Sequence, residues 1–276
     1  MTGRDLEGGV ARAREVLAAA GEIFVLTGAG ISAESGVPTF RGEDGLWKNH
    51  RPEELATPGA FRRDPRLVWE WYGWRRGLIS ACEPNAGHRA LAALAGSRPG
   101  VRIVTQNVDG LHTLAVREAV GPSGESADDP DESSGTHHDP TLPLELHGSL
   151  FRVRCTECSH QEEHRAEIDA TSTETLPRCR KCGALLRPDV VWFGESLDPT
   201  VLDQAAEVAR SADVALVVGT SAVVEPAASL PRLTASSGGT LIEVNPDETP
   251  LSSRTDVSLR GPAGSILPRL LRGEKV

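Results

Sequence analysis

Six short apolar runs, several of them separated by stretches of helical periodicity, constrain the fold of this chain more than any other feature. Most runs are continuous and lack the alternation of a half-exposed strand, which is typical of parallel strands buried on both faces. Helical patterns follow Pro84 and Asp198, and a third lies between the last two runs. This alternation predicts an α/β fold with a doubly wound parallel sheet. The runs cover residues 22–28, 101–107, 143–148, 188–194, 213–221 and 240–245.

Two segments break this alternation and resemble modules inserted into the α/β frame. Residues 41–89 have a largely helical pattern, and residues 151–184 carry four of the five cysteines. We therefore predict a small helical module over the first segment and a metal-binding module over the second. The remaining ranges, 1–40, 90–150 and 185–276, would form one domain around the sheet.

The charge of the chain is unevenly distributed. There are 29 Lys and Arg against 39 Asp and Glu, which gives a net charge of −10. Residues 118–139 hold seven of the acidic residues and no Lys or Arg, among many Gly, Ser and Pro. We predict a flexible surface insertion there, because such a segment cannot bury enough apolar area to offset the entropy of ordering it. The acidic balance argues against nonspecific nucleic-acid binding, which requires a cationic surface.

Residues 1–21 interleave arginines with acidic residues and have the pattern of an amphipathic helix, without the apolar centre of a signal peptide. No apolar run approaches the roughly 20 residues needed to cross a bilayer. We therefore expect a cytoplasmic protein that does not associate with membranes. The sequence leaves the oligomeric state open, and we expect a monomer.

Two Cys-x2-Cys pairs, separated by twenty residues, predict a zinc site in the second module. Each pair places two thiolates on one side of a tight turn, and two pairs supply the four ligands of a tetrahedral ion. Disulfides are a poor alternative in a chain without a secretion signal. Four sulfur ligands leave no open position for a water molecule, so we expect one structural Zn²⁺. The ligands would be Cys155, Cys158, Cys179 and Cys182, whereas Cys82 lies apart and receives no role.

The first apolar run leads into the glycine-containing stretch TGAGISAESGVPTFRG, residues 27–42. Gly28 and Gly30 would let the backbone approach a phosphate group closely. However, Ala33 stands where the usual dinucleotide-binding fingerprint has its third glycine. The glycines alone therefore leave nucleotide binding open.

Polar side chains follow two further runs, at the strand ends where α/β sheets bind ligands. The stretch TQNVDGLH (105–112) includes Asn107 and Asp109, and ELHGS (145–149) includes His147. A lone histidine is more often structural than catalytic. A histidine at the mouth of a sheet, with an amide and a carboxylate at a neighbouring strand end, is a candidate for acid–base chemistry.

Taken together and in this order, the motifs of the chain resemble those of the sirtuins. They are Gly-Ala-Gly-Ile-Ser, Thr-Gln-Asn-Val-Asp-Gly-Leu-His, Leu-His-Gly, the double Cys-x2-Cys, VWFGE, GTS and VNP, and they extend from about residue 20 to the C-terminal region. The resemblance implies a Rossmann-type NAD-binding domain with an inserted helical module and an inserted zinc module. It also implies an NAD-dependent protein lysine deacylase, with NAD as a consumed co-substrate and acyl-lysine side chains of proteins as partners.

The resemblance also implies roles for individual residues. His147 matches the general base of the family, and Gln106 would contact the ribose. Asn107, counted among the catalytic residues, would shape the nicotinamide pocket with Asp109. Val191, Phe193 and Gly194 would form the cleft edge that pairs with the substrate peptide as an added strand. The remaining cofactor contacts would come from Gly28, Ala29, Gly30, Glu34, Phe40, Arg41, Trp47, Gly219, Thr220, Ser221, Asn245 and Ala263.

The stretch WEWYGWRRG, residues 69–77, gathers the only tyrosine of the chain, three of its five tryptophans and two arginines. By itself it is more typical of a helix with an aromatic core face and solvated arginines, although it also fits a pocket with a cationic end. One sirtuin class carries a Tyr-x-x-Arg pair that faces the acyl pocket, and Tyr72 and Arg75 match it. Thr39 likewise stands where deacetylating classes usually carry Asp. A phenol and a guanidinium on one helix face would bind a carboxylate, which implies succinyl-, malonyl- or glutaryl-lysine as the preferred substrate.

Several alternatives stay open at this point. One alternative is that the protein is mainly a deacetylase, and another is that it is a protein mono-ADP-ribosyltransferase. A noncatalytic NAD-binding protein is the third, and it agrees less well with an intact His147. We assign Trp69 and Trp71 to packing. Arg76, one residue beyond Arg75, is expected to point elsewhere on the helix.

Overall fold

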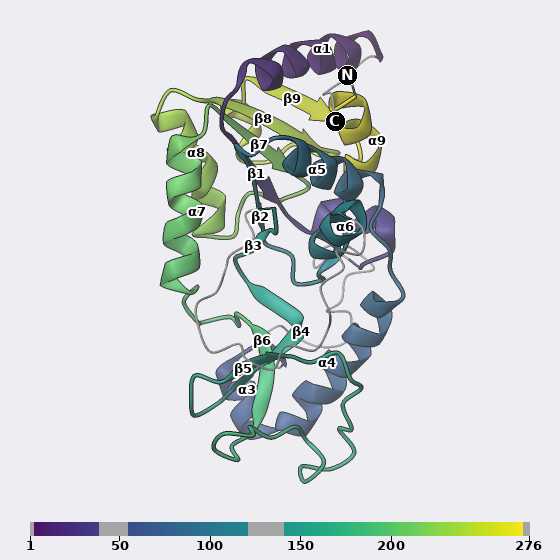
Figure 1. Ribbon diagram of the computed structural model, residues 1–276, viewed down its shortest axis with the longest axis vertical. Helices are drawn as coiled ribbons and strands as arrows, with labels where there is room; N and C mark the ends of the chain where they lie inside the picture. The colour runs from purple at the N-terminus through teal and green to yellow at the C-terminus, as the bar shows by residue number, and fades with distance from the viewer. Residues whose placement is uncertain (1–2, 39–54, 121–140, 273–276) are drawn as a thin grey trace.

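The computed structural model describes residues 3–38, 55–120 and 141–272 (Figure 1). They form a large parallel sheet with helices around it and a smaller lobe below it in the view of Figure 1. Four residues with predicted roles lie outside the described residues, namely Thr39, Phe40, Arg41 and Trp47.

Six strands form the main sheet in the order β3-β2-β1-β7-β8-β9, and every neighbouring pair is parallel. The inner strands β1 and β7 are buried at every position, as their continuous apolar sequences predicted. The predicted α/β fold with a parallel sheet is therefore confirmed. The strands are β1 (Ile23–Thr27), β2 (Val101–Thr105), β3 (Leu144–Glu145), β7 (Val214–Val218), β8 (Thr240–Asn245) and β9 (Val257–Arg260).

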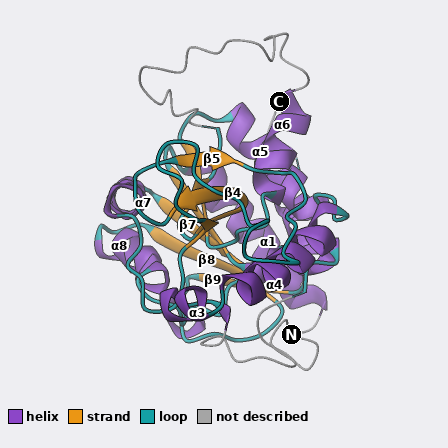
Figure 2. Cartoon of the chain, turned by 90° about the horizontal axis from the view of Figure 1, so that it is seen from below, coloured by secondary structure: helices purple, strands orange, loops and turns teal. Residues whose placement is uncertain are grey.

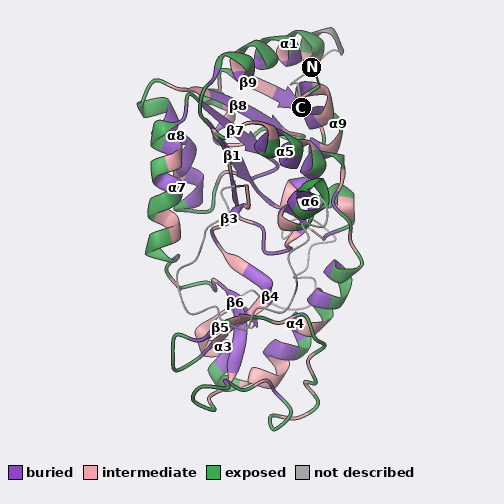
Figure 3. Ribbon diagram, in the orientation of Figure 1, coloured by how far each residue is buried: buried purple, intermediate pink, exposed green. Residues whose placement is uncertain are grey.

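Helices cover both faces of this sheet, which is why its strands can be apolar on both sides. Ile23 and Val25 of β1 belong to a hydrophobic cluster with α1, α5 and α9. Phe24 and Leu26 belong to the cluster on the other face, with α7 and α8. Figure 2 shows the strands between these helices, and Figure 3 shows buried strands beneath helices whose outer faces are exposed. The helices are α1 (Gly3–Ala19), α5 (Ala86–Ser97), α6 (Leu111–Val120), α7 (Pro199–Ser211), α8 (Leu230–Ser236) and α9 (Ala263–Leu270).

Short polar residues begin several of the helices. Thr57, Asp64 and Asp198 each precede a proline, and each side chain accepts a hydrogen bond from a backbone N–H of the first turn. Asn85 caps α5 in the same way, and His88 completes a capping box by accepting from the Asn85 backbone. These local signals fix where each helix starts without reference to the rest of the fold.

The small lobe, defined as α3, α4 and the antiparallel sheet β5-β4-β6, combines the two segments that interrupted the alternation. Its two helices and the strands β4 and β6 share one hydrophobic cluster. The Trp69 indole on α4 donates a hydrogen bond of 3.0 Å to the carbonyl oxygen of Leu186 on β6, so this tryptophan has the packing role that we assigned to it. The elements are α3 (Pro58–Arg63), α4 (Pro65–Ser80), β4 (Gly148–Cys155), β5 (Gln161–Glu163) and β6 (Leu186–Val190).

Three expectations from the sequence were wrong in detail. The run at 188–194 is not a strand of the parallel sheet, because its strand β6 pairs antiparallel with β4 in the small lobe and is buried there. Strand β9 was not predicted, because an edge strand with alternating burial has no continuous apolar run. Residues 118–120 belong to α6 rather than to a flexible insertion, and Glu118 pairs with Arg89 of α5 at 3.1 Å.

Among the described residues, no helix has the length and apolar character needed to traverse a bilayer.

Candidate active site and zinc site

Three loops that follow parallel strands meet at the carboxyl end of the main sheet. The loop after β1 is attached to the end of β7 by hydrogen bonds from the Gly28 N–H to the Val218 oxygen (3.0 Å) and from the Gly30 N–H to the Gly219 oxygen (2.7 Å). A Cβ on Gly30 would lie 2.7 Å from that Gly219 oxygen, and Gly219 itself has φ +59°. These glycines therefore allow two loops to pack directly on each other, a role that the fingerprint comparison did not anticipate.

Gln106 and Asn107 connect the end of β2 to the other two loops. Gln106 Nε2 donates to Thr220 Oγ1 at 3.0 Å, and Asn107 Nδ2 donates to the Gly28 oxygen at 3.2 Å and to Ser32 Oγ at 3.1 Å. Residues predicted to contact the cofactor from three different strands are thus brought together, as expected for ligand sites at the carboxyl ends of parallel strands.

Asn107 also contacts a chain of buried polar side chains that the sequence analysis did not identify. Ser32 Oγ donates to Asp109 Oδ2 at 2.8 Å. Nε2 of His88 lies 3.3 Å from the same Ser32 oxygen, while its Nδ1 accepts from the Asn85 backbone N–H. Because Nδ1 is an acceptor, the neutral ring carries its proton on Nε2 and donates it to Ser32.

A second histidine, His112, lies beside His88 with the two rings edge to face and 4.7 Å between their centroids. Its Nε2 is 2.9 Å from Thr27 Oγ1. Burial lowers the pKa of His88 to about 4 and the pKa of His112 well below its usual value, so both rings are neutral at pH 7. Burial also raises the pKa of Asp109, against the opposing effect of its hydrogen bonds.

His147, the predicted general base, lies in the turn between β3 and β4. Its Nδ1 is 2.9 Å from the carbonyl oxygen of Gln106, which can only accept, so Nδ1 carries the proton and Nε2 presents its lone pair. Burial lowers the pKa of His147 below its usual value, with partial opposition from this hydrogen bond. The ring is therefore neutral at pH 7 and suited to accept a proton.

The turn that holds His147 is fixed by ion pairs and by one glycine. Arg152 bridges Glu145 on β3 (2.7 Å) and Asp189 on β6 (3.0 Å), so it joins the main sheet to the small lobe. Gly148 has φ +78°, and a Cβ there would lie 2.0 Å from the Asp189 oxygen. The predicted Leu-His-Gly motif thus needs its glycine for this close approach.

The predicted substrate edge continues directly from His147. The Val191 N–H donates to the His147 carbonyl oxygen at 3.0 Å, and the Phe193 N–H donates to the Ala56 oxygen at 2.9 Å. Phe193 exposes 57% of its surface, and Gly194 has φ +84°. An exposed aromatic side chain two residues beyond Val191 is a surface on which an apolar part of a ligand can pack.

The Tyr72 and Arg75 pair is buried in the small lobe. The Tyr72 oxygen accepts a hydrogen bond of 2.9 Å from Trp192 Nε1, a tryptophan that the sequence analysis left without a role. The Arg75 guanidinium carbon lies 4.8 Å from the Trp71 ring centroid and 5.8 Å from that of Tyr72. Burial lowers the pKa of Arg75, and electrostatic interactions with Tyr72 and Asp109 oppose this effect.

Arg76 is not a solvated arginine, contrary to one of the two readings of this stretch. It is 6% exposed, its guanidinium carbon lies 5.8 Å from the Phe151 ring centroid, and its Nη2 lies 3.5 Å from His164 Nδ1. It does point away from Arg75, toward β4 and β5, as expected for adjacent residues on a helix. Because it is buried, a substitution there would affect stability.

Other residues predicted to contact the cofactor, further from His147, have hydrogen bonds to their own surroundings and not to Gln106 or Asn107. Glu34 accepts a hydrogen bond of 2.6 Å from the Gly264 N–H, so its carboxylate caps the start of α9, next to the buried Ala263. Asn245 ends β8 and donates to the Asp247 oxygen, and Ser221 is exposed after β7. Glu34 thus has a capping role in addition to any contact with a ligand.

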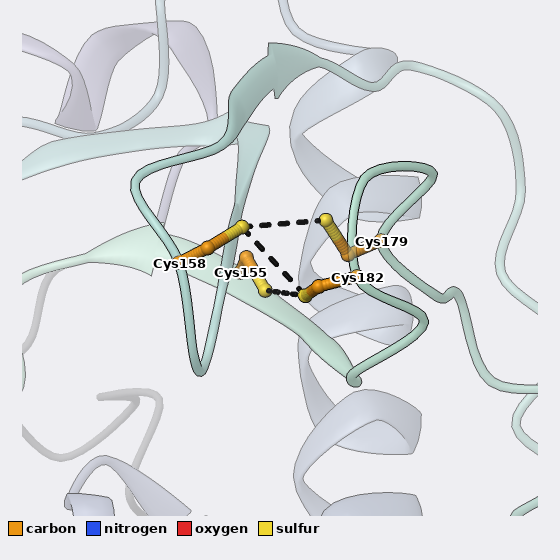
Figure 4. A group of neighbouring side chains, drawn as sticks. All are labelled: Cys155, Cys158, Cys179 and Cys182. Atoms are coloured by element: carbon orange, nitrogen blue, oxygen red, sulfur yellow. Dashed lines mark hydrogen bonds between the residues drawn. The ribbon is translucent and has the colours of Figure 1, made fainter.

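The four predicted zinc ligands converge in the small lobe (Figure 4). All four Sγ atoms lie within 4.8 Å of one another, with contacts of 3.4 Å between Cys155 and Cys182 and 3.7 Å from Cys158 to Cys179 and to Cys182. Sulfur atoms at 2.3 Å from a tetrahedral Zn²⁺ would be separated by about 3.8 Å. The cluster therefore fits a structural zinc ion, which would join the turn after β4 to the segment before β6.

Comparison with known proteins agrees with this geometry. The chain matches the Sir2 family over residues 28–122 and 128–226. It is 49% identical over 252 residues to NAD-dependent protein deacylase 1 of Archaeoglobus fulgidus, covering 91% of each chain, and 47% identical over 266 residues to NAD-dependent protein deacylase of Thermococcus kodakarensis, covering 95% of each.

Two solved structures extend the comparison. A Sir2 homologue in complex with NAD superimposes with a TM-score of 0.81 at 46% identity, covering 95% of this chain and 92% of that one. Sir2Af2 bound to a myristoylated histone peptide superimposes with a TM-score of 0.69 at 33% identity, covering 96% and 95%. The family match, the identities and the shared fold agree over nearly the whole length: the chain belongs to the Sir2 family.

Proposed function

We propose that this NAD-dependent protein deacylase of the Sir2 family acts preferentially on lysines that carry a negatively charged acyl group, such as succinyl, malonyl or glutaryl, and more weakly on acetyl-lysine. One observation carries the preference. A guanidinium, that of Arg75, is 3% exposed one helical turn from a buried phenol, that of Tyr72. A buried guanidinium and a buried phenol can both donate hydrogen bonds to a carboxylate, and such charge-assisted hydrogen bonds are strong where water is largely excluded.

The pair is connected to the predicted base through a short series of contacts. Tyr72 is hydrogen bonded to the Trp192 side chain, and the preceding residue, Val191, is hydrogen bonded to the backbone of His147. An acyl-lysine laid along this edge would therefore present its acyl end toward Tyr72 and Arg75, and its amide toward His147.

The residues of the site fit NAD and the expected division of labour. NAD, when bound, supplies the ribose that accepts the acyl group and the nicotinamide that leaves. Asn107 and Asp109, buried at the end of β2, would hold the nicotinamide end, and Gln106 would orient the ribose. His147 accepts a hydroxyl proton at Nε2, which is its only acceptor position because Nδ1 donates to the Gln106 carbonyl.

The roles of Arg75 and Tyr72 differ. The guanidinium supplies the charge, because burial weakens screening by water. The Tyr72 oxygen already accepts from Trp192, so its own O–H serves as the second donor to the acyl carboxylate. A charge-assisted hydrogen bond of this kind contributes about 1.5–3 kcal/mol, which is about 10- to 150-fold in kcat/KM. An acetyl group has no carboxylate and gains nothing.

The test is the ratio of kcat/KM values on succinyl- and acetyl-lysine versions of one peptide. Arg75→Met keeps an unbranched apolar stem and removes the charge, so it should lower the ratio at least about 10-fold and leave deacetylation unchanged or faster. The matched control is Arg66→Met on the same helix, where the Arg66 side chain is 43% exposed and pairs with Glu70. A ratio that stays the same in Arg75→Met, or falls equally in Arg66→Met, would contradict the proposal.

A further inference from the structure

Arg187, which is buried, and Glu195, which is half-buried, form an ion pair that holds the side chain of Trp192. Arg187 donates from Nη1 to Glu195 Oε1 at 2.5 Å and from Nη2 to Oε2 at 2.8 Å. Its guanidinium carbon lies 3.4 Å from the centroid of the Trp192 ring. Glu195 Oε2 also accepts from the Trp192 backbone N–H at 2.8 Å. The ion pair therefore holds both the backbone and the ring of this tryptophan.

The other edge of the same indole contacts Tyr72, one of the two residues proposed to bind the acyl carboxylate. Trp192 Nε1 donates to the Tyr72 oxygen at 2.9 Å, and the two side chains are only 2% and 1% exposed. Phe61 packs on the indole with 5.5 Å between ring centroids. Because one direction at the Tyr72 oxygen is occupied by a fixed donor, the direction of its own O–H is restricted to what remains.

We propose that Arg187 and Glu195 are positioning residues for acyl selection: they orient Trp192, which in turn aims the Tyr72 hydroxyl at the acyl carboxylate. The proposal rests on the proposed function, since it explains how one of the two carboxylate donors is aimed. Hydrogen bonds weaken steeply as their angle departs from linearity. A small rotation of the indole would therefore change binding at Tyr72, although neither charged residue contacts the acyl group.

Burial raises the pKa of Glu195, but the hydrogen bonds from Arg187 and from the Trp192 backbone lower it below its usual value, so the pair contributes to stability. Apolar side chains could supply stability as well. Replacing a buried ion pair by apolar residues of similar volume is often neutral or stabilising, because desolvation offsets the attraction. A two-point guanidinium–carboxylate contact is instead directional and rigid. Arg154 adds a further contact to Glu195 Oε1 at 3.3 Å. Directional support of Trp192 is what these contacts supply and apolar packing would not.

Tyr72 is the only tyrosine of the chain, which makes the proposal directly testable. Protein labelled with [13Cζ]tyrosine gives one resonance that reports on the Tyr72 hydroxyl. Glu195→Gln removes the charge of the pair, and Arg187→Lys keeps a charge but loses the two-point contact and the stacking. We expect both to move the resonance and to lower the succinyl-to-acetyl ratio of kcat/KM about 3- to 10-fold, the effect of one weakened hydrogen bond. The matched control is Glu163→Gln, an exposed carboxylate on β5 of the same lobe, which should do neither.

An unmoved resonance in folded Glu195→Gln overturns the proposal, as does an equal loss of activity on both substrates with an unchanged ratio. If Glu195→Gln does not fold, Arg187→Lys decides by the same two measurements. If the wild-type enzyme shows no preference for succinyl-lysine, the proposed function fails, whereas the resonance still decides whether the ion pair controls Tyr72.

Discussion

Acidification should destabilise this protein through His88, whose imidazole is fully buried. Burial lowers the pKa of this ring from 6.5 to about 4. Its Nδ1 accepts from the Asn85 N–H, and a proton placed on Nδ1 would face that donor instead of an acceptor. The unfolded chain exposes the same ring and binds the proton near pH 6.5, so unfolding takes up a proton between the two pKa values.

The sign and the size of the effect follow from this difference. Between pH 6.5 and about 4 the unfolded state binds more protons than the folded state, so the free energy of unfolding falls as the pH falls. The difference between these two pKa values lowers the free energy of unfolding by roughly 3 kcal/mol once the pH is below both of them. About 2 kcal/mol of this is lost between pH 7 and pH 5, a large part of the roughly 5–15 kcal/mol that stabilises a typical domain.

The assay is urea unfolding at pH 7 and at pH 5, followed by tryptophan fluorescence, for the wild type and for His88→Gln. Glutamine does not titrate, and its amide can still donate to Ser32. The variant should be less stable at pH 7, because the capping contact is lost, yet it should lose about 2 kcal/mol less on acidification. Protonation of the zinc ligands affects both proteins and cancels in the comparison. The pKa of His112 is lowered by burial and by the neighbouring His88, so the loss of His88 changes the comparison in the same direction. Equal losses in the two proteins would refute the argument that His88 is held neutral by burial.

His147→Ala should lower deacylation about 10²- to 10⁴-fold while NAD binding, measured by calorimetry, persists; a variant with a tenth of wild-type turnover would exclude its role as base. Cys179→Ser should lose the metal and unfold at lower temperature, and elemental analysis that finds no zinc in active wild-type protein would contradict the site. Gly219→Ala should destabilise the fold by at least about 1 kcal/mol, because a Cβ would lie 2.5 Å from the Ile31 nitrogen at a positive φ; an unchanged urea midpoint would show that the loops can separate.

Features that depend on local pattern were predictable from the sequence. The strand cores around Val25 and Leu216 are continuous apolar runs because helices cover both faces, and that pattern gave the parallel sheet. The zinc ligands were predictable because the spacing of each Cys-x2-Cys pair is itself the geometry of half a site. Asn107 and His147 were predicted as site residues because polar groups at the ends of apolar strands are conspicuous in the sequence, and their roles stay predictions.

Features that depend on contacts distant in sequence were not predictable in this way. Ser32, His88 and Asp109 form one hydrogen-bonded chain, yet they come from three separate segments, and His88 looks like any helix-capping residue. Trp192 and Arg187 looked like parts of an apolar run and its flank, because stacking and ion pairing have no signature in residue spacing. The run at 188–194 was assigned to the wrong sheet for a similar reason. A continuous apolar run predicts a buried strand, but it does not show with which strands that strand pairs.

The pairing of β1 with β7 has a consequence for the synthesis of the chain. Ile23 pairs with Val214, about 190 residues later in the sequence, while its other partner in β2 is Val101. At a synthesis rate of roughly 5–20 residues per second, one edge of this apolar strand waits about 10–40 seconds for its partner. Unpaired strand edges invite association with other chains, and such distant pairings form slowly. We therefore expect the nascent protein to depend on chaperones, and a chain that stops before β7 to aggregate instead of folding as a smaller unit.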